Sequence, residues 1–97
     1  MADLTYIVVL RAQDGKAELL GADLVDMLTQ TRREAGCSLA ELNRSSEDPA
    51  TWMVYERWKS KEAFASHMEQ PYTLQFVARM GDLISAPADV RAFIHQP

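Results

Sequence analysis

The chain has few of the features that mark secreted, membrane-bound or nucleic-acid-binding proteins. It has 97 residues and one cysteine, Cys37, so an intrachain disulfide is excluded. No apolar run approaches the roughly 20 residues that cross a bilayer. The net charge is −4 and the basic residues form no stripe, which argues against nucleic acid and membranes as partners. The N-terminal MADLTYIVVL has an acid where a signal peptide has basic residues, so we expect a cytoplasmic protein.

Motifs for several common chemistries are also absent. The sequence contains no G-x-G-x-x-G, no G-x-x-x-x-G-K and no H-E-x-x-H, and no serine nucleophile elbow. Its two histidines, His67 and His95, are too far apart to indicate a metal site by themselves. We therefore expect neither a nucleotide nor a metal site.

Strand and helix patterns alternate along a single domain that spans residues 1–97. Apolar alternation or β-rich composition predicts strands, and apolar residues at helical spacing predict helices. Gly21 is expected to weaken the first helix by about 1 kcal/mol relative to alanine, and Gly36 to end it. The order is β-α-β-β-α-β, an α+β, ferredoxin-like fold with a four-stranded antiparallel sheet and helices on one face. The predicted strands cover 4–11, 37–44, 51–58 and 88–95, and the predicted helices cover 16–35, 61–69 and 71–80. Thr31 keeps the apolar spacing of the first helix, Ser60 is the expected N-cap of the second, and Pro71 begins the third.

The first strand predicts an interaction between subunits. Residues 4–11 are apolar on both faces in the middle of the strand. A strand of this kind is covered on both faces, and helices in so small a domain cover only one. We therefore expect a homodimer that forms through the open face of the sheet.

The stretch 51–72 contains most of the residues that could take part in catalysis or ligand binding. Glu56 shares a strand face with Trp58, and a carboxylate there needs a partner or a function. His67 lies on the inner side of the next helix, one turn after Ala63. If that helix packs over Glu56, the two side chains could hydrogen-bond and shuttle a proton. The same pair could instead only fix the helix on the sheet, and the sequence leaves both readings open.

Other polar and aromatic residues are candidates for a pocket. Tyr72 follows Pro71 at a helix start, where its hydroxyl could enter a pocket. Trp58 could be part of the core or contact a ligand. Asn43 could be a polar pocket group or the end of a hairpin.

Three segments resemble a known family. The stretch from Tyr55 to Tyr72, Y-E-R-W-K-S-K-E-A-F-A-S-H-x-x-x-P-Y, is similar to the antibiotic biosynthesis monooxygenase family, which includes quinol monooxygenase-like proteins. The segments E-A-G-C at 34–37 and L-I-S-A-P at 83–87 extend the resemblance over most of the chain. The resemblance implies a dimeric α/β barrel built from ferredoxin-like protomers.

The resemblance also implies an activity and a set of site residues. The activity would be oxidation of a small phenolic or quinol-type aromatic with O₂, with no metal, flavin or other cofactor. Glu56 and His67 match the glutamate and histidine of the motif and would be catalytic. The expected substrate-binding residues are Trp58, Tyr72, Phe64, Phe76 and Asn43.

One position departs from part of the family. Some quinone-forming members have an asparagine where this chain has Val54, and Asn43 would have to replace it. Haem-degrading members of the superfamily use an asparagine on the first strand, and LTYIVVLR has none. Haem binding, isomerisation and a non-catalytic dimeric domain are the alternatives to oxygenation.

Overall fold

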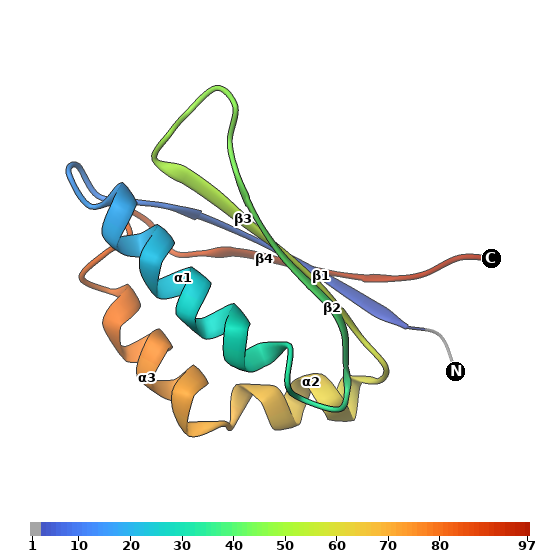
Figure 1. Cartoon of the computed structure of the whole chain (residues 1–97). Helices are drawn as coiled ribbons and strands as arrows, with labels where there is room; N and C mark the ends of the chain where they lie inside the picture. Colours follow the sequence, from blue (N-terminus) through green and yellow to red (C-terminus); the bar gives the residue numbers. More distant parts are fainter. Residues whose placement is uncertain (1–2) are drawn as a thin grey trace.

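The computed structural model describes residues 3–97 and has the predicted ferredoxin-like order of elements (Figure 1). The first two residues of the predicted domain 1–97 lie outside the described residues. The α+β fold and the split of the second helical region at Pro71 are confirmed. The elements are β1 (Leu4–Arg11), α1 (Ala17–Thr31), β2 (Cys37–Arg44), β3 (Thr51–Trp58), α2 (Lys61–Met68), α3 (Pro71–Met80) and β4 (Asp89–Ile94).

The four strands form one antiparallel sheet in the order β2-β3-β1-β4. In the register of β1 and β3, Tyr6 lies opposite Glu56 and Val8 lies opposite Val54. Alternate residues of a strand point to opposite faces. Tyr6, Val8, Val54, Glu56 and Trp58 therefore share one face, as the sequence predicted for β3.

The three helices lie on that same face of the sheet (Figure 1). Helix α1 contributes three fully buried leucines, Leu20, Leu24 and Leu28, at 0–1% exposure. They pack with Leu10 and Val54 of the sheet in one core cluster. Burial of each large apolar side chain contributes roughly 1.5–3 kcal/mol, so this cluster fixes α1 on the sheet.

Two glycines have a different role from the one expected. Helix α1 ends at Thr31, earlier than predicted, and Gly36 does not have a positive φ. A Cβ on Gly36 would lie 2.4 Å from the Cβ of Ala63, and one on Gly21 would lie 2.4 Å from the ring of Trp52. Close packing thus requires both glycines. At Gly21 helix α1 packs against β3, and at Gly36 the turn before β2 packs against α2.

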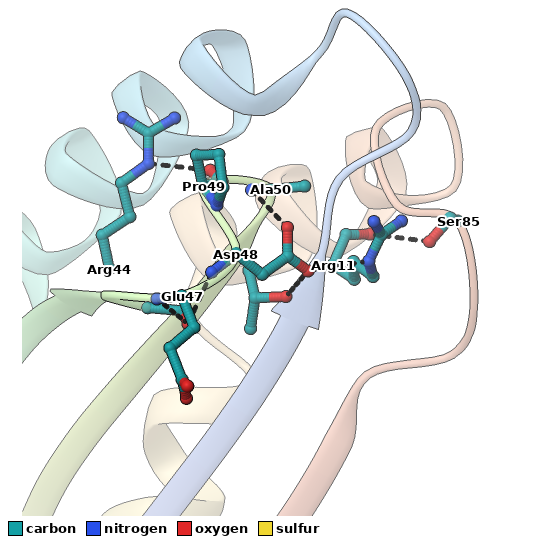
Figure 2. A network of polar contacts seen from close by, with 9 residues as sticks. Arg11, Arg44, Glu47, Asp48, Pro49, Ala50 and Ser85 are labelled. Atoms are coloured by element: carbon teal, nitrogen blue, oxygen red, sulfur yellow. Dashed lines mark hydrogen bonds and ion pairs between the residues drawn. The ribbon is translucent and has the colours of Figure 1, made fainter.

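The loop between β2 and β3 is held by its own polar side chains (Figure 2). The Asp48 carboxylate accepts hydrogen bonds from the Ala50 amide at 3.1 Å, the Thr51 hydroxyl at 2.8 Å and Arg11 Nε at 3.0 Å. Arg44 Nε donates to the Pro49 carbonyl at 2.8 Å. Hydrogen bonds from Thr51 and Ala50 lower the pKa of Asp48. The loop therefore fixes the register of the hairpin that presents Glu56.

The opposite face of the sheet is not covered by a helix within residues 3–97 (Figure 1). The register places Ile7, Val9, Tyr55 and Phe93 on this face. Phe93 is 48% exposed. The homodimer stays a prediction. None of the helices in the described part of the chain is long and apolar enough to cross a membrane.

Candidate functional site

Glu56 is a buried carboxyl group on the helix-covered face of β3. It is 3% exposed, and its Oε1 accepts a hydrogen bond from Trp58 Nε1 at 2.9 Å. The two residues are two positions apart and therefore point to the same face. Burial raises the pKa of Glu56, and the Trp58 hydrogen bond and the nearby His67 oppose that rise. Glu56 thus keeps its proton to a higher pH than an exposed glutamate does.

His67 enters the site on α2, whose position is well defined. The side chain of Ser60 caps the helix by accepting a hydrogen bond from the Ala63 amide at 3.0 Å, as the sequence predicted. Ala63 is the residue that contacts Gly36, so α2 lies close against the turn before β2. His67 is 2% exposed, and its ring lies 4.7 Å from that of Trp58 between centroids.

His67 belongs to a polar group that we call the Glu34 cluster, formed by Thr31, Glu34, His67 and Tyr72. His67 Nδ1 lies 2.7 Å from Glu34 Oε2 and 3.2 Å from the Tyr72 hydroxyl oxygen. The Tyr72 hydroxyl donates to Glu34 Oε2 and lies 3.1 Å from Thr31 Oγ1. The cluster therefore joins the end of α1 to α2 and the start of α3.

The surroundings of Tyr72 in this cluster keep its hydroxyl protonated. Burial, together with the hydrogen bond to Glu34, raises the pKa of Tyr72 to about 12. The phenol is therefore protonated at neutral pH and acts as a hydrogen-bond donor rather than as a base.

A cavity of about 120 Å³ lies between the sheet and the helices, next to this cluster. Most of its wall is apolar, and among residues 3–97 only Glu56, His67 and Thr73 bring polar side chains to it. An apolar cavity of roughly 150 Å³ holds a benzene-sized molecule, so this one is on the scale of a single small ring. Its size and wall suit a small aromatic group with one polar substituent.

The structure brings together most of the residues that the sequence singled out. Glu56, His67, Phe64 and Phe76 line the cavity. Trp58 is fully buried, packs edge-on against Phe64 with centroids 6.0 Å apart, and does not reach the cavity wall. The hydrogen bond that the sequence allowed between Glu56 and His67 is not formed: Glu56 accepts from Trp58, and His67 pairs with Glu34.

Two other predicted positions differ from expectation. Tyr72 contributes to the Glu34 cluster and does not line the cavity. Asn43 pairs with Met53 in the β2–β3 ladder and therefore lies on the open face of the sheet, away from the cavity. Asn43 is thus not placed to replace the asparagine that is missing at Val54.

Sequence reasoning missed Glu34, Thr31 and Thr73. Glu34 was part of the E-A-G-C segment, but nothing in its spacing from His67 showed that the two would meet. Thr31 kept the apolar spacing of α1 and was read as a core position. Thr73 is 2% exposed, lines the cavity, and its hydroxyl has no hydrogen-bond partner among residues 3–97.

Replacing Glu56 by glutamine is expected to change how stability depends on pH. The unfolded-state pKa is about 4.5 and the folded-state pKa is raised. A raised pKa contributes stability that is complete below the unfolded value and is lost as the pH rises through the folded value. Glutamine cannot ionise and does not lose this stability. The melting temperature of Glu56→Gln, relative to that of the wild type, should therefore increase as the pH rises from about 4.5.

Thermal unfolding followed from pH 4 to 8 measures this effect. Glu69→Gln, at the exposed residue that follows the end of α2, is the matched control and should give a curve parallel to the wild type. Parallel curves for Glu56→Gln as well would show that the carboxyl group titrates normally.

The sequence and the structure are both similar to those of known proteins. The family model for antibiotic biosynthesis monooxygenases matches residues 4–79. Putative monooxygenase Rv0793 of Mycobacterium tuberculosis is 35% identical over 71 residues, which are 73% of this chain and 69% of that protein. Putative monooxygenase YcnE of Bacillus subtilis is 27% identical over 84% of this chain and 85% of that protein.

Solved structures of related proteins have the same fold as this chain. The structure of Rv0793 superposes with a TM-score of 0.93 at 26% identity, covering 98% of this chain and 96% of that one. Protein SO0527 from Shewanella oneidensis also gives 0.93 at 26% identity, over 97% and 91% of the two chains. The match to the family model covers more than half of the sequence, and the relatives share its full fold. The chain therefore belongs to the antibiotic biosynthesis monooxygenase family.

Proposed function

We propose that the protein is a monooxygenase that oxidises a small phenolic or quinol-type aromatic with O₂ and uses no metal or flavin. The observation that carries this proposal is the cavity of about 120 Å³, whose largely apolar wall includes one imidazole, one carboxyl group and one threonine hydroxyl. An apolar site holds both an aromatic ring and O₂, and the two titratable groups can handle the protons of the reaction. Membership of the family, and relatives that are named monooxygenases, support the same reaction class.

The reaction begins with removal of the phenolic proton by His67. The resulting phenolate is electron-rich and passes one electron to O₂, and the two radicals then join through a new carbon–oxygen bond at a ring carbon that carries hydrogen. The outer oxygen of the adduct takes a proton. Cleavage of the O–O bond, with loss of the ring C–H proton, releases water and leaves a quinone. One oxygen atom of O₂ thus enters the product and the other enters water.

Glu56 is suited to supply the proton that the peroxide adduct needs. Burial raises its pKa, so it holds a proton under conditions in which an exposed glutamate is ionised. The Trp58 indole fixes one of its oxygens at 2.9 Å and so limits the directions in which the carboxyl group can point. In this scheme His67 is the base and Glu56 is the acid.

Oxygen consumption by the purified, chelator-treated protein tests the proposal. We expect uptake of O₂ with single-ring phenols and hydroquinones, formation of quinone absorbance, and less uptake with fused-ring phenols that exceed the cavity. Incorporation of one atom of ¹⁸O into the product distinguishes oxygenation from simple oxidation of the substrate. No uptake above the protein-free rate with any single-ring phenol would contradict the proposal.

We also propose that two copies of the chain associate through the open face of the sheet. Apolar side chains of β1, β3 and β4 gather there, and no helix covers them within residues 3–97. Light scattering coupled to size exclusion should report twice the 10.9 kDa of one chain. An Ile7→Lys change in the centre of this face should return the monomer, whereas a monomeric wild type would contradict the proposal.

A further inference from the structure

The contacts of His67 determine which of its two ring nitrogens carries the proton in the neutral form. Nδ1 lies 2.7 Å from Glu34 Oε2. An unprotonated Nδ1 would there place its lone pair against a carboxylate oxygen, which is repulsive, whereas a protonated Nδ1 donates a charge-assisted hydrogen bond. The negative charge of Glu34 is also felt by Tyr72, whose pKa is raised first by burial and then by its hydrogen bond to Glu34. Nδ1 therefore holds the proton.

The other ring nitrogen is then free to act on a ligand. With the proton on Nδ1, Nε2 presents a lone pair. Among residues 3–97 no hydrogen bond reaches Nε2, and His67 lines the cavity. Free neutral imidazole side chains favour the opposite tautomer, with the proton on Nε2, which cannot accept a proton at that atom. The protein must therefore supply the preference, and the group that contacts Nδ1 and can supply it is the Glu34 carboxylate.

Glu34 is itself held from several sides. Its amide donates to the Thr31 carbonyl at 3.1 Å, and its carbonyl accepts from the Cys37 amide at 3.0 Å, so the turn after α1 is closed at both ends. Its side chain is 16% exposed, accepts a hydrogen bond from the Tyr72 hydroxyl and contacts His67 Nδ1. Thr31 in turn donates to the Met27 carbonyl at 2.9 Å. The backbone of Glu34 is thus fixed, and its carboxylate cannot move away from His67 without also breaking the hydrogen bond from Tyr72.

We propose that Glu34 is a positioning residue that holds His67 in the Nδ1-protonated tautomer, with Nε2 available to the cavity, and stabilises the imidazolium that forms when Nε2 takes a proton. Its catalytic consequence rests on the proposed function. The arrangement follows the logic of a buried carboxylate behind a catalytic histidine, in which the carboxylate selects the tautomer and does not itself take the proton. Tyr72 is the second donor that keeps Glu34 oriented.

Nitrogen-15 NMR of histidine-labelled protein tests the tautomer without any substrate. In the wild type at neutral pH, long-range proton–nitrogen spectra should show His67 with the proton on Nδ1. The exposed His95 gives an internal reference in the same spectrum and should show mainly the Nε2-protonated form. Glu34→Ala should convert most of His67 to the Nε2-protonated form. A wild-type His67 protonated on Nε2, or an unchanged pattern in Glu34→Ala, would overturn the proposal.

A second variant separates charge from geometry and guards against misfolding. Glu34→Gln keeps the length of the side chain and an oxygen that can accept from Nδ1, but it removes the negative charge. With a phenol that the wild type oxidises, kcat should fall roughly 10²–10⁴-fold while KM changes little, because the imidazolium loses its counter-charge. An unchanged kcat would overturn the catalytic part of the proposal. If the tautomer pattern holds but no phenol is oxidised by the wild type, the proposed function fails and the role of Glu34 in the tautomer stands.

Discussion

Replacing His67 by alanine is expected to lower the turnover of a phenolic substrate by roughly 10²–10⁴-fold, the usual contribution of a positioned general base. His67 is the single imidazole in the cavity wall, and its Nε2 has no competing hydrogen bond among residues 3–97. Glu56 is less suited to this role, because burial raises its pKa and favours the protonated form, and its Oε1 is engaged by the Trp58 indole. The measurement is initial O₂ uptake at saturating phenol, with kcat and KM separated.

The control for this variant is its neighbour on the same helix. Ser66→Ala changes an exposed residue of α2 and should leave turnover at the wild-type rate. Raising the pH should partly restore His67→Ala, because a phenol that is already ionised in solution needs no base. Wild-type turnover by His67→Ala at neutral pH would remove His67 from the mechanism.

Trp58→Ala is expected to cost about 3–5 kcal/mol of the free energy of unfolding, the range for deletion of a large buried ring. Trp58 is 0% exposed and contacts Phe64 and His67 with its ring. The change also removes the donor of the one hydrogen bond to Glu56 and leaves a buried carboxyl group without it. Domains of this kind are stable by only about 5–15 kcal/mol, so a loss of this size is a large fraction of the total.

Urea unfolding measures that loss. Trp58→Phe retains most of the ring and should lose less, the difference from wild type reporting the cost of the missing indole donor. Leu74→Ala on α3 is the control for an exposed apolar residue, at 55% exposure, and should change the free energy of unfolding by less than about 0.5 kcal/mol. A loss below about 1 kcal/mol in Trp58→Ala would contradict the packing described here.

Local rules were sufficient to predict the elements and the face of the sheet that carries the site. The alternation in β3 placed Glu56 and Trp58 on the helix-covered face, and Ser60 and Pro71 marked the starts of α2 and α3, all as observed. These features depend on residues within one or two turns of each other. They are therefore visible in the sequence.

Contacts between distant segments could not be predicted in the same way. Glu34 and His67 are 33 residues apart, and their contact depends on where α1 ends and on how closely α2 approaches it. That approach depends on Gly36, which sequence reasoning took for a helix stop and which instead makes room for Ala63. The Glu56–His67 hydrogen bond that the sequence allowed is absent for a related reason. His67 has Glu34 as its partner, which only the folded chain brings near, whereas Glu56 accepts from Trp58 two residues along the same strand.

The hydrogen bond from Trp58 to Glu56 gives the protein an intrinsic optical signal. The indole is fully buried, and its one N–H points at a carboxyl group whose ionisation changes the electric field on the ring. Its fluorescence should therefore follow the protonation of Glu56 and the filling of the adjacent cavity. In a Trp52→Phe background Trp58 is the one remaining tryptophan, and excitation on the long-wavelength side of tyrosine absorption selects it over the tyrosines. Occupancy of the site could then be read from the emission spectrum alone, before any substrate has been identified.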